Sequence, residues 1–236
     1  MSTPRPTRRP WPSQCLICRA WPAQPVCRAC AARFAPPGTR CESCALPVPA
    51  GVARCGACLR EPPPLDLCLA AVPYQWPWTG CIARLKFHQD AGLAAPLADL
   101  LTRAPGVADA LALADLVLPM PLSPERLAER GYNPSVLLAR RLAPARCRID
   151  LLVRTRHTPP QRGLARADRL RNVRGAFSVD PLRAHELHER RVALVDDVMT
   201  TGASLHEAAR ALRDAGARHV VALAFARTDE PAAGRS

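Results

Sequence analysis

Eight of the eleven cysteines fall into four Cys-x-x-Cys pairs within the first 60 residues. Two thiolates on one tight turn can reach the same metal ion, and two such turns complete the tetrahedral site that structural zinc prefers. The short gaps between consecutive pairs make sequential pairing the simplest arrangement, although an interleaved cross-brace remains open. Sequential pairing gives one site from Cys15, Cys18, Cys27 and Cys30, and another from Cys41, Cys44, Cys55 and Cys58.

The sequence around these cysteines favours zinc over disulfides or redox chemistry. A disulfide framework is typical of exported proteins, and the Arg- and Pro-rich N-terminus has no apolar segment of the kind that signal peptides need. Four repeated pairs also differ from the single pair of a thioredoxin-type motif. Residues 1–60 offer little aliphatic core, so a module of this size needs metal to fold. We therefore predict two structural zinc sites and a cytoplasmic location.

A second set of reactive residues follows an apolar run near the C-terminus. Val192–Val195 is typical of a central strand that is covered on both faces, and the adjacent carboxylates Asp196 and Asp197 come directly after it. A helix with one apolar face and another apolar strand, His219–Ala226, complete a βαβ unit, which implies a parallel sheet. The loop between the acids and the helix contains Thr200, Thr201, Gly202, Ala203 and Ser204.

These acids and this loop fall where parallel sheets bind ligands, beyond the carboxyl ends of the strands. Gly202 lets the backbone approach a ligand, and successive N–H groups at a helix N-terminus form a cradle for an anion. Paired carboxylates can accept hydrogen bonds from ribose hydroxyls, directly or through hydrated magnesium. The pattern therefore indicates a ribose 5-phosphate site. A plain helix-capping loop would leave two carboxylates at the end of a buried strand unexplained.

The remaining elements must position this loop. The Glu61–Pro64 run reads as a linker, and the pattern after it alternates between strands and helices. The predicted domains are a double zinc ribbon with a basic, Pro-rich tail (1–60), a linker (61–66), an α/β domain (67–228) and a flexible tail (229–236). The predicted strands are Leu67–Pro73, Asp115–Met120, Leu151–Arg154 and Ala176–Val179, and the helices are Gly80–Phe87, Leu93–Leu101 and Pro124–Leu142 with an interruption at Gly131.

The formal net charge of +13 is concentrated in two segments. Residues 1–60 contain nine Arg and one acid, and residues 154–174 contain seven Arg and one acid. Such clusters imply anionic partners, for example phosphate, nucleic acid or an acidic protein surface. An apolar content of 48% excludes wholesale disorder. No apolar stretch reaches the length of a membrane-spanning helix, so we expect no membrane insertion.

Several longer motifs carry a resemblance to a known family. The run VALVDDVMTTGASL, residues 192–205, resembles the phosphoribosyl pyrophosphate (PRPP) motif of type I phosphoribosyltransferases. Leu-Lys-Phe at 85–87, Pro-Met-Pro-Leu at 119–122 and Glu-Arg-Gly-Tyr-Asn at 129–133 are similar to segments of the ComF/GntX family, in which a double zinc ribbon precedes the transferase domain. Pro134 stands where that family usually has Gln. The resemblance implies an α/β fold: a type I phosphoribosyltransferase-like parallel sheet with flanking helices, preceded by a small zinc-ribbon module.

The resemblance also implies roles for residues of this chain. Asp196 and Asp197 would face the ribose hydroxyls of PRPP, with magnesium as cofactor, and Thr200–Ser204 would hold its 5-phosphate. Two weaker sets complete the expected site. The pyrophosphate side would contain Pro119, Met120, Pro121, Arg126 and Arg130, and the loop that closes over the site would contain Arg154, Arg156, Gln161 and Arg169.

Two functions remain open from the sequence. The first is magnesium-dependent transfer of a ribosyl 5-phosphate from PRPP to an unknown acceptor. The second is a non-catalytic PRPP sensor or adaptor, whose ribbons would grip single-stranded DNA or a competence-protein partner, because the family is associated with DNA uptake. The acceptor and the oligomeric state are also open.

Overall fold

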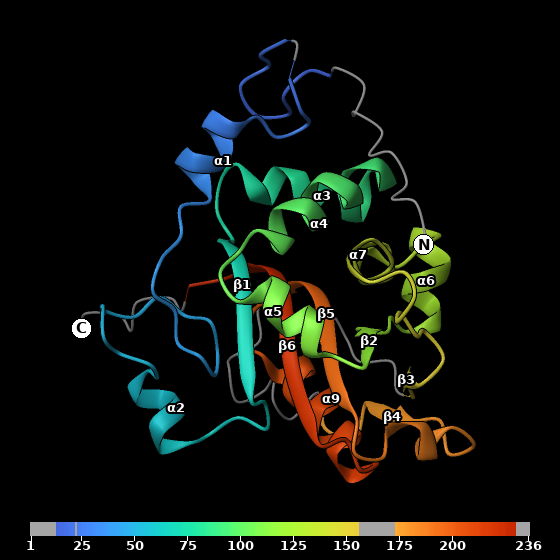
Figure 1. Cartoon of the computed structure of the whole chain (residues 1–236). Helices are drawn as coiled ribbons and strands as arrows, with labels where there is room; N and C mark the ends of the chain where they lie inside the picture. The colour runs from blue at the N-terminus through green and yellow to red at the C-terminus, as the bar shows by residue number, and fades with distance from the viewer. Residues whose placement is uncertain (1–12, 22, 156–172, 230–236) are drawn as a thin grey trace, which may run out of the picture. The chain divides into compact units, whose positions relative to one another are not determined.

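The computed structural model describes residues 13–21, 23–155 and 173–229, and the chain divides into two compact units at Pro36/Pro37. In the first unit, an antiparallel bridge joins Ser13 to Ala23, and helix α1 (Arg28–Phe34) follows (Figure 1). The second unit contains the rest of the described chain. The second unit includes the second group of four cysteines, whereas the predicted domain 1–60 contained both groups.

A four-stranded parallel sheet forms the centre of the second unit (Figure 1). Leu194 lies opposite both Leu118 and Ala222 in the two neighbouring strands. The two middle strands are largely buried, and each contains an apolar run, Val192–Val195 in one and Val220–Ala226 in the other, as expected for strands covered on both faces. In spatial order the strands are β1 (Leu67–Pro73), β6 (His219–Arg227), β5 (Arg191–Met199) and β2 (Leu116–Pro119).

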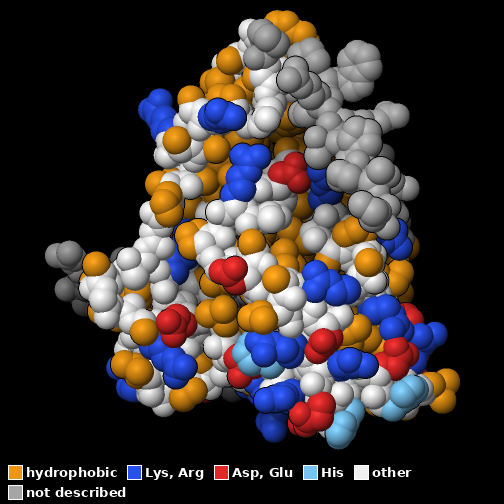
Figure 2. Space-filling model, viewed as in Figure 1, with side chains coloured by type: hydrophobic (Ala, Val, Ile, Leu, Met, Phe, Trp, Pro, Cys, Tyr) orange, Lys and Arg blue, Asp and Glu red, His pale blue; other side chains and the backbone are white. Residues whose placement is uncertain are grey.

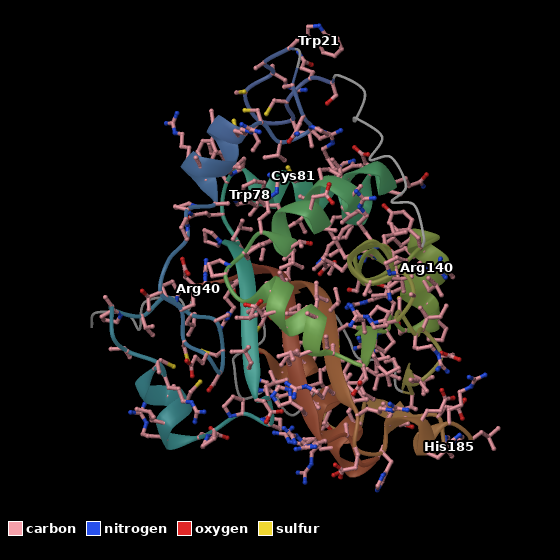
Figure 3. All side chains as sticks on the ribbon, viewed as in Figure 1. Trp21, Arg40, Trp78, Cys81, Arg140 and His185 are labelled. Carbon is pink, nitrogen blue, oxygen red and sulfur yellow. The ribbon has the colours of Figure 1, made fainter. Side chains whose placement is uncertain are left out.

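One group of helices packs together on the sheet. Helix α7 packs on β5 and β2, and α4 packs on α7. Trp78 and Phe225 meet edge to face at 5.8 Å, which fixes α3 to β6; Figure 3 labels Trp78 and Cys81 on α3. The helices between β1 and residue 151 are α3 (Trp78–Phe87), α4 (Ala94–Thr102), α5 (Val107–Leu113), α6 (Pro124–Arg130) and α7 (Pro134–Leu142), with a short 3-10 helix, η1 (Ala91–Leu93).

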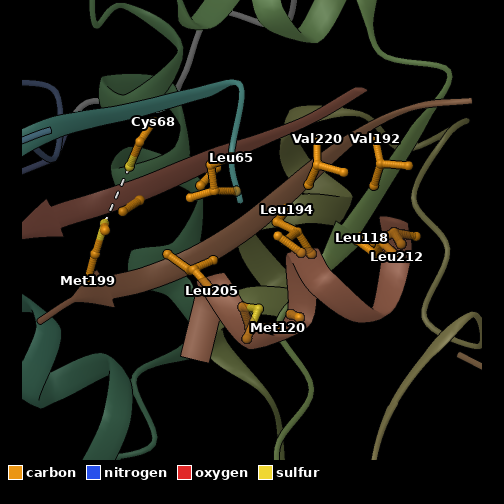
Figure 4. Packing of buried hydrophobic residues seen from close by; sticks show 14 of the residues in the cluster. Leu65, Cys68, Leu118, Met120, Val192, Leu194, Met199, Leu205, Leu212 and Val220 are labelled. Atoms are coloured by element: carbon orange, nitrogen blue, oxygen red, sulfur yellow. Dashed lines mark hydrogen bonds between the residues drawn. The ribbon is translucent and has the colours of Figure 1, made fainter. Parts of the chain in front are cut away.

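A second apolar core forms around helix α9 (Ala203–Asp214), whose Leu205 and Leu212 are buried with Val192 and Leu194 of β5 (Figure 4). The small antiparallel pair β3 (Leu152–Arg154) and β4 (Phe177–Val179) contacts α9, and η2 (Ala184–Leu187) follows β4. The second cysteine ribbon, with helix α2 (Gly56–Arg60), buries Cys41, Cys44 and Cys58 in this same core. The ribbon is therefore part of the sheet domain's packing.

Several surface charges of the second unit form ion pairs. Arg148 contacts both Asp150 and Glu186, and Arg183 contacts the same two acids. Basic and acidic side chains intermix in the region where Figure 3 labels His185, at the lower right of the space-filling view (Figures 2 and 3). Among the described residues, no helix is long and apolar enough to cross a membrane.

The predicted elements agree with the structure in type. β5 continues through Asp196 and Asp197 to Met199, because its pairing with β6 extends to Arg227. The interruption predicted at Gly131 is confirmed, because Gly131 caps α6 at φ +79° and α7 follows. The short helices α1, α2 and α5 and the 3-10 helix η2 were not predicted. The predicted N-terminal tail, and the C-terminal tail beyond Asp229, lie outside the described residues.

Candidate functional site

A cavity of about 680 Å³ lies in the second unit, at the carboxyl ends of β5 and β2. Its wall combines acids, bases, hydroxyls and aromatic rings. It is lined by Tyr74, Lys86, Phe87, Met120, Pro121, Leu122, Arg126, Glu129, Arg130, Ser135, Arg154, Phe177, Asp196, Asp197, Val198, Thr200 and Ser204.

The two carboxylates of β5 have different partners. Lys86 Nζ lies 2.7 Å from Asp197 Oδ1, and both side chains are largely buried. Asp196 Oδ1 accepts hydrogen bonds from the Ser135 hydroxyl at 3.1 Å and from the Asp197 N–H at 2.9 Å. Burial and the adjacent Asp197 raise the pKa of Asp196 to about 7, against the opposing effects of Lys86 and the two hydrogen bonds. Burial therefore favours the protonated form of Asp196.

The loop after β5 has the geometry of an anion cradle. Gly202 adopts a φ of +82° and serves as the N-cap of α9, so the chain turns sharply between the strand and the helix. The Thr201 hydroxyl accepts a hydrogen bond from the Ala203 N–H at 3.3 Å. Thr200 and Ser204 line the cavity. The first turn of α9 adds N–H groups without helical partners, together with the positive end of its dipole.

The opposite wall of the cavity carries arginines that stack on aromatic rings. The Arg130 guanidinium lies 5.4 Å from the Phe87 ring centroid, and that of Arg154 lies 5.3 Å from Phe177. Burial and the nearby Arg126 lower the pKa of Arg154. Three arginines and a lysine thus line the cavity together with three acids, and burial favours the protonated form of Asp196 among those acids. The arginines offer binding sites for the negative charges of a ligand.

Residues 131–135 connect three parts of the site. The Tyr132 hydroxyl donates to the Leu85 carbonyl beside Lys86. Asn133 donates to the Met120 carbonyl at 2.9 Å, and its Oδ1 accepts from the Ser135 N–H at 2.9 Å as the cap of α7. Pro134 occupies the first turn of that helix, where a missing N–H costs nothing, so the departure from the family pattern is accommodated.

The structure brings many of the expected site residues together. Asp196, Asp197, Thr200 and Ser204 line the cavity, as do Met120, Pro121, Arg126, Arg130 and Arg154. Thr201, Gly202 and Ala203 form the turn behind the cavity wall, and Pro119 is the last residue of β2. Arg156, Gln161 and Arg169 lie outside the described residues. Their roles, and those of the lining residues, remain predictions.

Sequence reasoning missed several lining residues. Lys86 carried a signal, since it is the chain's only lysine and lies in the Leu-Lys-Phe segment. Tyr74 follows directly after β1, whose end meets the same edge of the sheet. Ser135 carried no signal, because only the packing of α7 against β5 brings it to Asp196.

The eight paired cysteines form two groups with sequential pairing. In each group the four sulfur atoms lie within 4.8 Å of one another, which excludes the cross-brace. The distances from Cys18 Sγ to Cys27 Sγ and from Cys44 Sγ to Cys55 Sγ are both 3.7 Å. A tetrahedron with Zn–S bonds of about 2.3 Å has edges of about 3.8 Å, so both groups fit a zinc ion.

The backbone around the sulfurs also suits bound metal. The N–H groups of Cys27 and Cys55 point at Cys15 Sγ and Cys41 Sγ, at 3.5 Å and 3.3 Å. Burial acts to raise the pKa of Cys15, yet N–H donors such as that of Cys27 outweigh it and lower the pKa to about 6. The same balance lowers the pKa of Cys41 to about 7. Each group therefore holds one thiol poised to be a thiolate, the form that binds metal.

The cavity also offers the oxygen ligands that magnesium prefers. Within the described residues, the hydrogen bonds of Asp196 and the ion pair of Asp197 fall on Oδ1, which leaves Oδ2 of each carboxylate available. The donor set therefore fits a hydrated magnesium ion.

Comparison with known proteins agrees with this geometry. The family model described as "Phosphoribosyl transferase domain" matches residues 127–233. "Competence protein F" of Haemophilus influenzae is 35% identical over 195 residues, covering 79% of this chain and 84% of that protein. "DNA utilization protein YhgH" of Escherichia coli K12 is 32% identical over 231 residues, and its Salmonella typhimurium counterpart is 33% identical over 226; each match covers 92% of this chain and 98% of the relative. The chain belongs to the ComF family of phosphoribosyltransferase-domain proteins.

Proposed function

We propose that the cavity binds PRPP with magnesium and that the protein transfers its ribosyl 5-phosphate to an acceptor that is still unidentified. The observation that carries the proposal is the meeting of an acidic pair, a hydroxyl-lined anion cradle and several arginines in one cavity. A phosphorylated sugar with a diol and a pyrophosphate presents the matching groups.

Each feature has a separate task in this proposal. The loop Thr200–Ser204 holds the 5-phosphate through N–H groups and hydroxyls. Asp196 and Asp197 accept hydrogen bonds from the ribose hydroxyls, and the Lys86 ammonium beside Asp197 offsets part of their negative charge. Arg126 and Arg130 neutralise charge on the pyrophosphate as the bond from its oxygen to the ribose C1 breaks and the acceptor's lone pair forms the new bond. Magnesium, when bound, supplies further positive charge to the pyrophosphate.

We also propose that both cysteine groups hold zinc in a structural role. Their sulfur spacing and N–H donors support this. Metal analysis of the purified protein should return about two zinc ions per chain. A folded, zinc-free chain would contradict this part of the proposal.

The names of the relatives support a cellular context. They are called a competence protein and DNA utilization proteins. We therefore place the proposed transfer reaction in the uptake or use of external DNA, with the cytoplasm as its compartment.

Pyrophosphate release from PRPP and magnesium, measured over a panel of nucleobases and amines, tests the catalytic proposal. The Asp196→Ala/Asp197→Ala variant should lose the release. Asp99→Ala is a suitable control, because this exposed carboxylate only pairs with Arg141 on the surface. Equal release by the wild type and the acidic-pair variant would rule out this site as the centre of reaction.

One observation favours a second candidate, a non-catalytic adaptor that binds single-stranded DNA or a protein partner. Residues 1–60 carry nine arginines and one acid, and Trp21 is 65% exposed in the first unit (Figure 3). Salt-sensitive binding of single-stranded DNA that survives loss of Asp196 and Asp197, yet fails with Cys18→Ser, would support it. DNA binding that is insensitive to salt and to that cysteine would count against it.

A further inference from the structure

A buried arginine joins the second cysteine group to the loop after β5. Arg227, the last residue of β6, is only 3% exposed. Its Nε donates to the Cys44 carbonyl at 2.7 Å, and its Nη1 donates to the Thr200 carbonyl. One planar guanidinium therefore binds two separate segments. Its Nε binds the turn at Cys44, one of the four metal-binding cysteines, and its Nη1 binds Thr200, the first residue of the anion cradle.

The bonding of this guanidinium is unusual for a buried cation. Its further acceptors are the carbonyls of Met199 at 3.4 Å and Thr228 at 2.5 Å, and the Thr228 hydroxyl at 3.3 Å. Within the described residues it forms no salt bridge with a carboxylate. Burying an arginine without an acid is costly. In return, the planar guanidinium, whose N–H donors point in fixed directions, fixes several main-chain segments relative to one another.

A second connection runs parallel to the first. The Cys68 N–H on β1 donates to the Glu42 carbonyl of the ribbon at 2.6 Å. The Cys68 sulfur lies 3.3 Å from the Met199 sulfur, at the end of β5, as the dashed line in Figure 4 marks. Cys41, Cys44 and Cys58 are buried in the same core as these residues. The ribbon thus contacts the end of β5 both through Arg227 and through apolar packing.

We propose that Arg227 couples metal occupancy of the second cysteine group (Cys41, Cys44, Cys55 and Cys58) to the conformation of the anion cradle Thr200–Ser204. Arg227 is then a positioning residue, since it holds the cradle without touching the ligand. The phosphate-affinity part of this inference rests on the proposed function. The structural part, communication between the cysteine group and the loop, stands on the described contacts alone.

The physical route is short. A metal held by all four sulfurs fixes the turn at Cys44 and therefore the direction of its carbonyl. The Thr200 carbonyl shares a planar peptide unit with the Thr201 N–H, so a guanidinium that fixes the carbonyl also fixes the direction of that N–H. When the four cysteines lose their metal, the turn at Cys44 becomes more mobile. The Arg227 guanidinium can then no longer hold the Cys44 and Thr200 carbonyls in one arrangement.

The first test needs no sugar phosphate. The full chain is prepared with zinc and with cadmium, which lengthens the metal–sulfur bonds, and amide ¹H–¹⁵N spectra are compared. We expect the amides of Thr201 and Gly202 to shift in the wild type. They should stay in place in Arg227→Met, which removes the donors but keeps an apolar stem. Cradle amides that do not respond to the metal in the wild type would overturn the proposal.

The reciprocal test observes the metal. With ¹¹³Cd in both groups, saturating PRPP and magnesium should shift the ¹¹³Cd resonance of the second group and leave that of the first unchanged. Cys18→Ser and Cys55→Ser assign the two resonances. If PRPP binds and neither resonance moves, the coupling is absent. If PRPP does not bind, the proposed function fails, while the ligand-free spectra still decide the coupling.

Affinity provides the third readout. Arg227→Met should weaken PRPP binding on the order of tenfold, within the usual range of coupling between sites. Arg227→Lys, which keeps the charge but lacks the separated Nε and Nη1 donors, should fall between it and the wild type. Arg146→Met is the matched control, because Arg146 also joins two carbonyls, those of Leu111 at 2.8 Å and Ala114 at 2.7 Å, away from the cavity. Equal weakening by the control would contradict a specific role for Arg227.

Discussion

At the scale of single residues, the site depends on how two neighbouring carboxylates are kept together. Asp197 has Lys86 at 2.7 Å, whereas Asp196 has neutral donors and the repulsion of its neighbour. Burial and this asymmetry raise the pKa of Asp196 to about 7, so this carboxyl binds a proton more readily than an ordinary aspartate. A diol or a hydrated cation that binds here would compete with that proton.

The raised pKa predicts a pH-dependent stability. Asp196 has an ordinary pKa of 3.8 and a folded-state value of about 7, so between these values the folded chain keeps a proton that the unfolded chain has lost. The contribution of Asp196 to stability therefore falls as pH rises through this window. Asp196→Asn removes this contribution to the pH dependence of stability. The melting temperature of the variant should therefore rise relative to that of the wild type as the pH increases from about 4 to about 7. A difference in melting temperature that is constant over this range would contradict the assignment.

The residue scale also marks the limit of sequence reasoning. Asp196 and Asp197 could be predicted because they interrupt a long apolar run. Ser135 and Tyr74 could not, because each reaches the cavity only through the packing of distant segments. Arg227 reads as an ordinary strand end in the sequence. Its burial follows from the position of the second ribbon, which no local pattern reveals.

At the scale of elements, the turn from β5 into α9 decides the shape of the cradle. Gly202 combines a φ of +82° with close neighbours: an added Cβ would lie 2.6 Å from Met199 Cε and 2.8 Å from His206 Nε2. Both the backbone conformation and the available space therefore require glycine. The sequence predicted this strand–loop–helix order because its apolar periodicity is strong, but it placed the end of β5 before the acids.

Gly202→Ala should destabilise the protein and weaken PRPP binding. The left-handed backbone alone costs alanine about 1 kcal/mol, and the crowded Cβ adds to that cost. Gly106→Ala is a matched control outside the ribbon and the cavity lining, since Gly106 has a similar φ of +77° and its added Cβ would lie in ordinary contact, 3.4 Å from Leu69 Cδ1. Denaturant unfolding and PRPP titration of both variants separate backbone strain from crowding. Equal loss of PRPP affinity in both would argue against a local role for the cradle.

At the scale of the whole molecule, the two cysteine groups differ in what surrounds them. The first lies in a compact unit that ends at Pro36, whereas the second is buried in the core of the sheet domain. The sequence predicted both groups and favoured the sequential pairing that the structure shows, with the cross-brace left open. It could not predict this difference, because the similar motifs carry no sign of what packs against them.

The difference predicts unequal effects of losing one ligand. Cys58→Ser should lower the melting temperature of the sheet domain by roughly 5–10 °C, which corresponds to about 2–3 kcal/mol for a domain of this size. Cys30→Ser is the matched change in the first group, and it should leave the melting temperature of the sheet domain unchanged. Calorimetry with zinc analysis of both variants provides the measurement. Equal shifts would mean that the second ribbon has no special part in the domain.

The most direct test of the central claim is a thermal shift of the full chain with PRPP and magnesium. Ligand at about 100 times its dissociation constant adds about 2.7 kcal/mol to the folded state, so the sheet domain should melt several degrees higher. The rise should disappear in Asp196→Ala/Asp197→Ala and persist in Asp99→Ala. An unchanged melting temperature in the wild type, or an equal rise in the acidic-pair variant, would contradict the assignment of this cavity as a PRPP site.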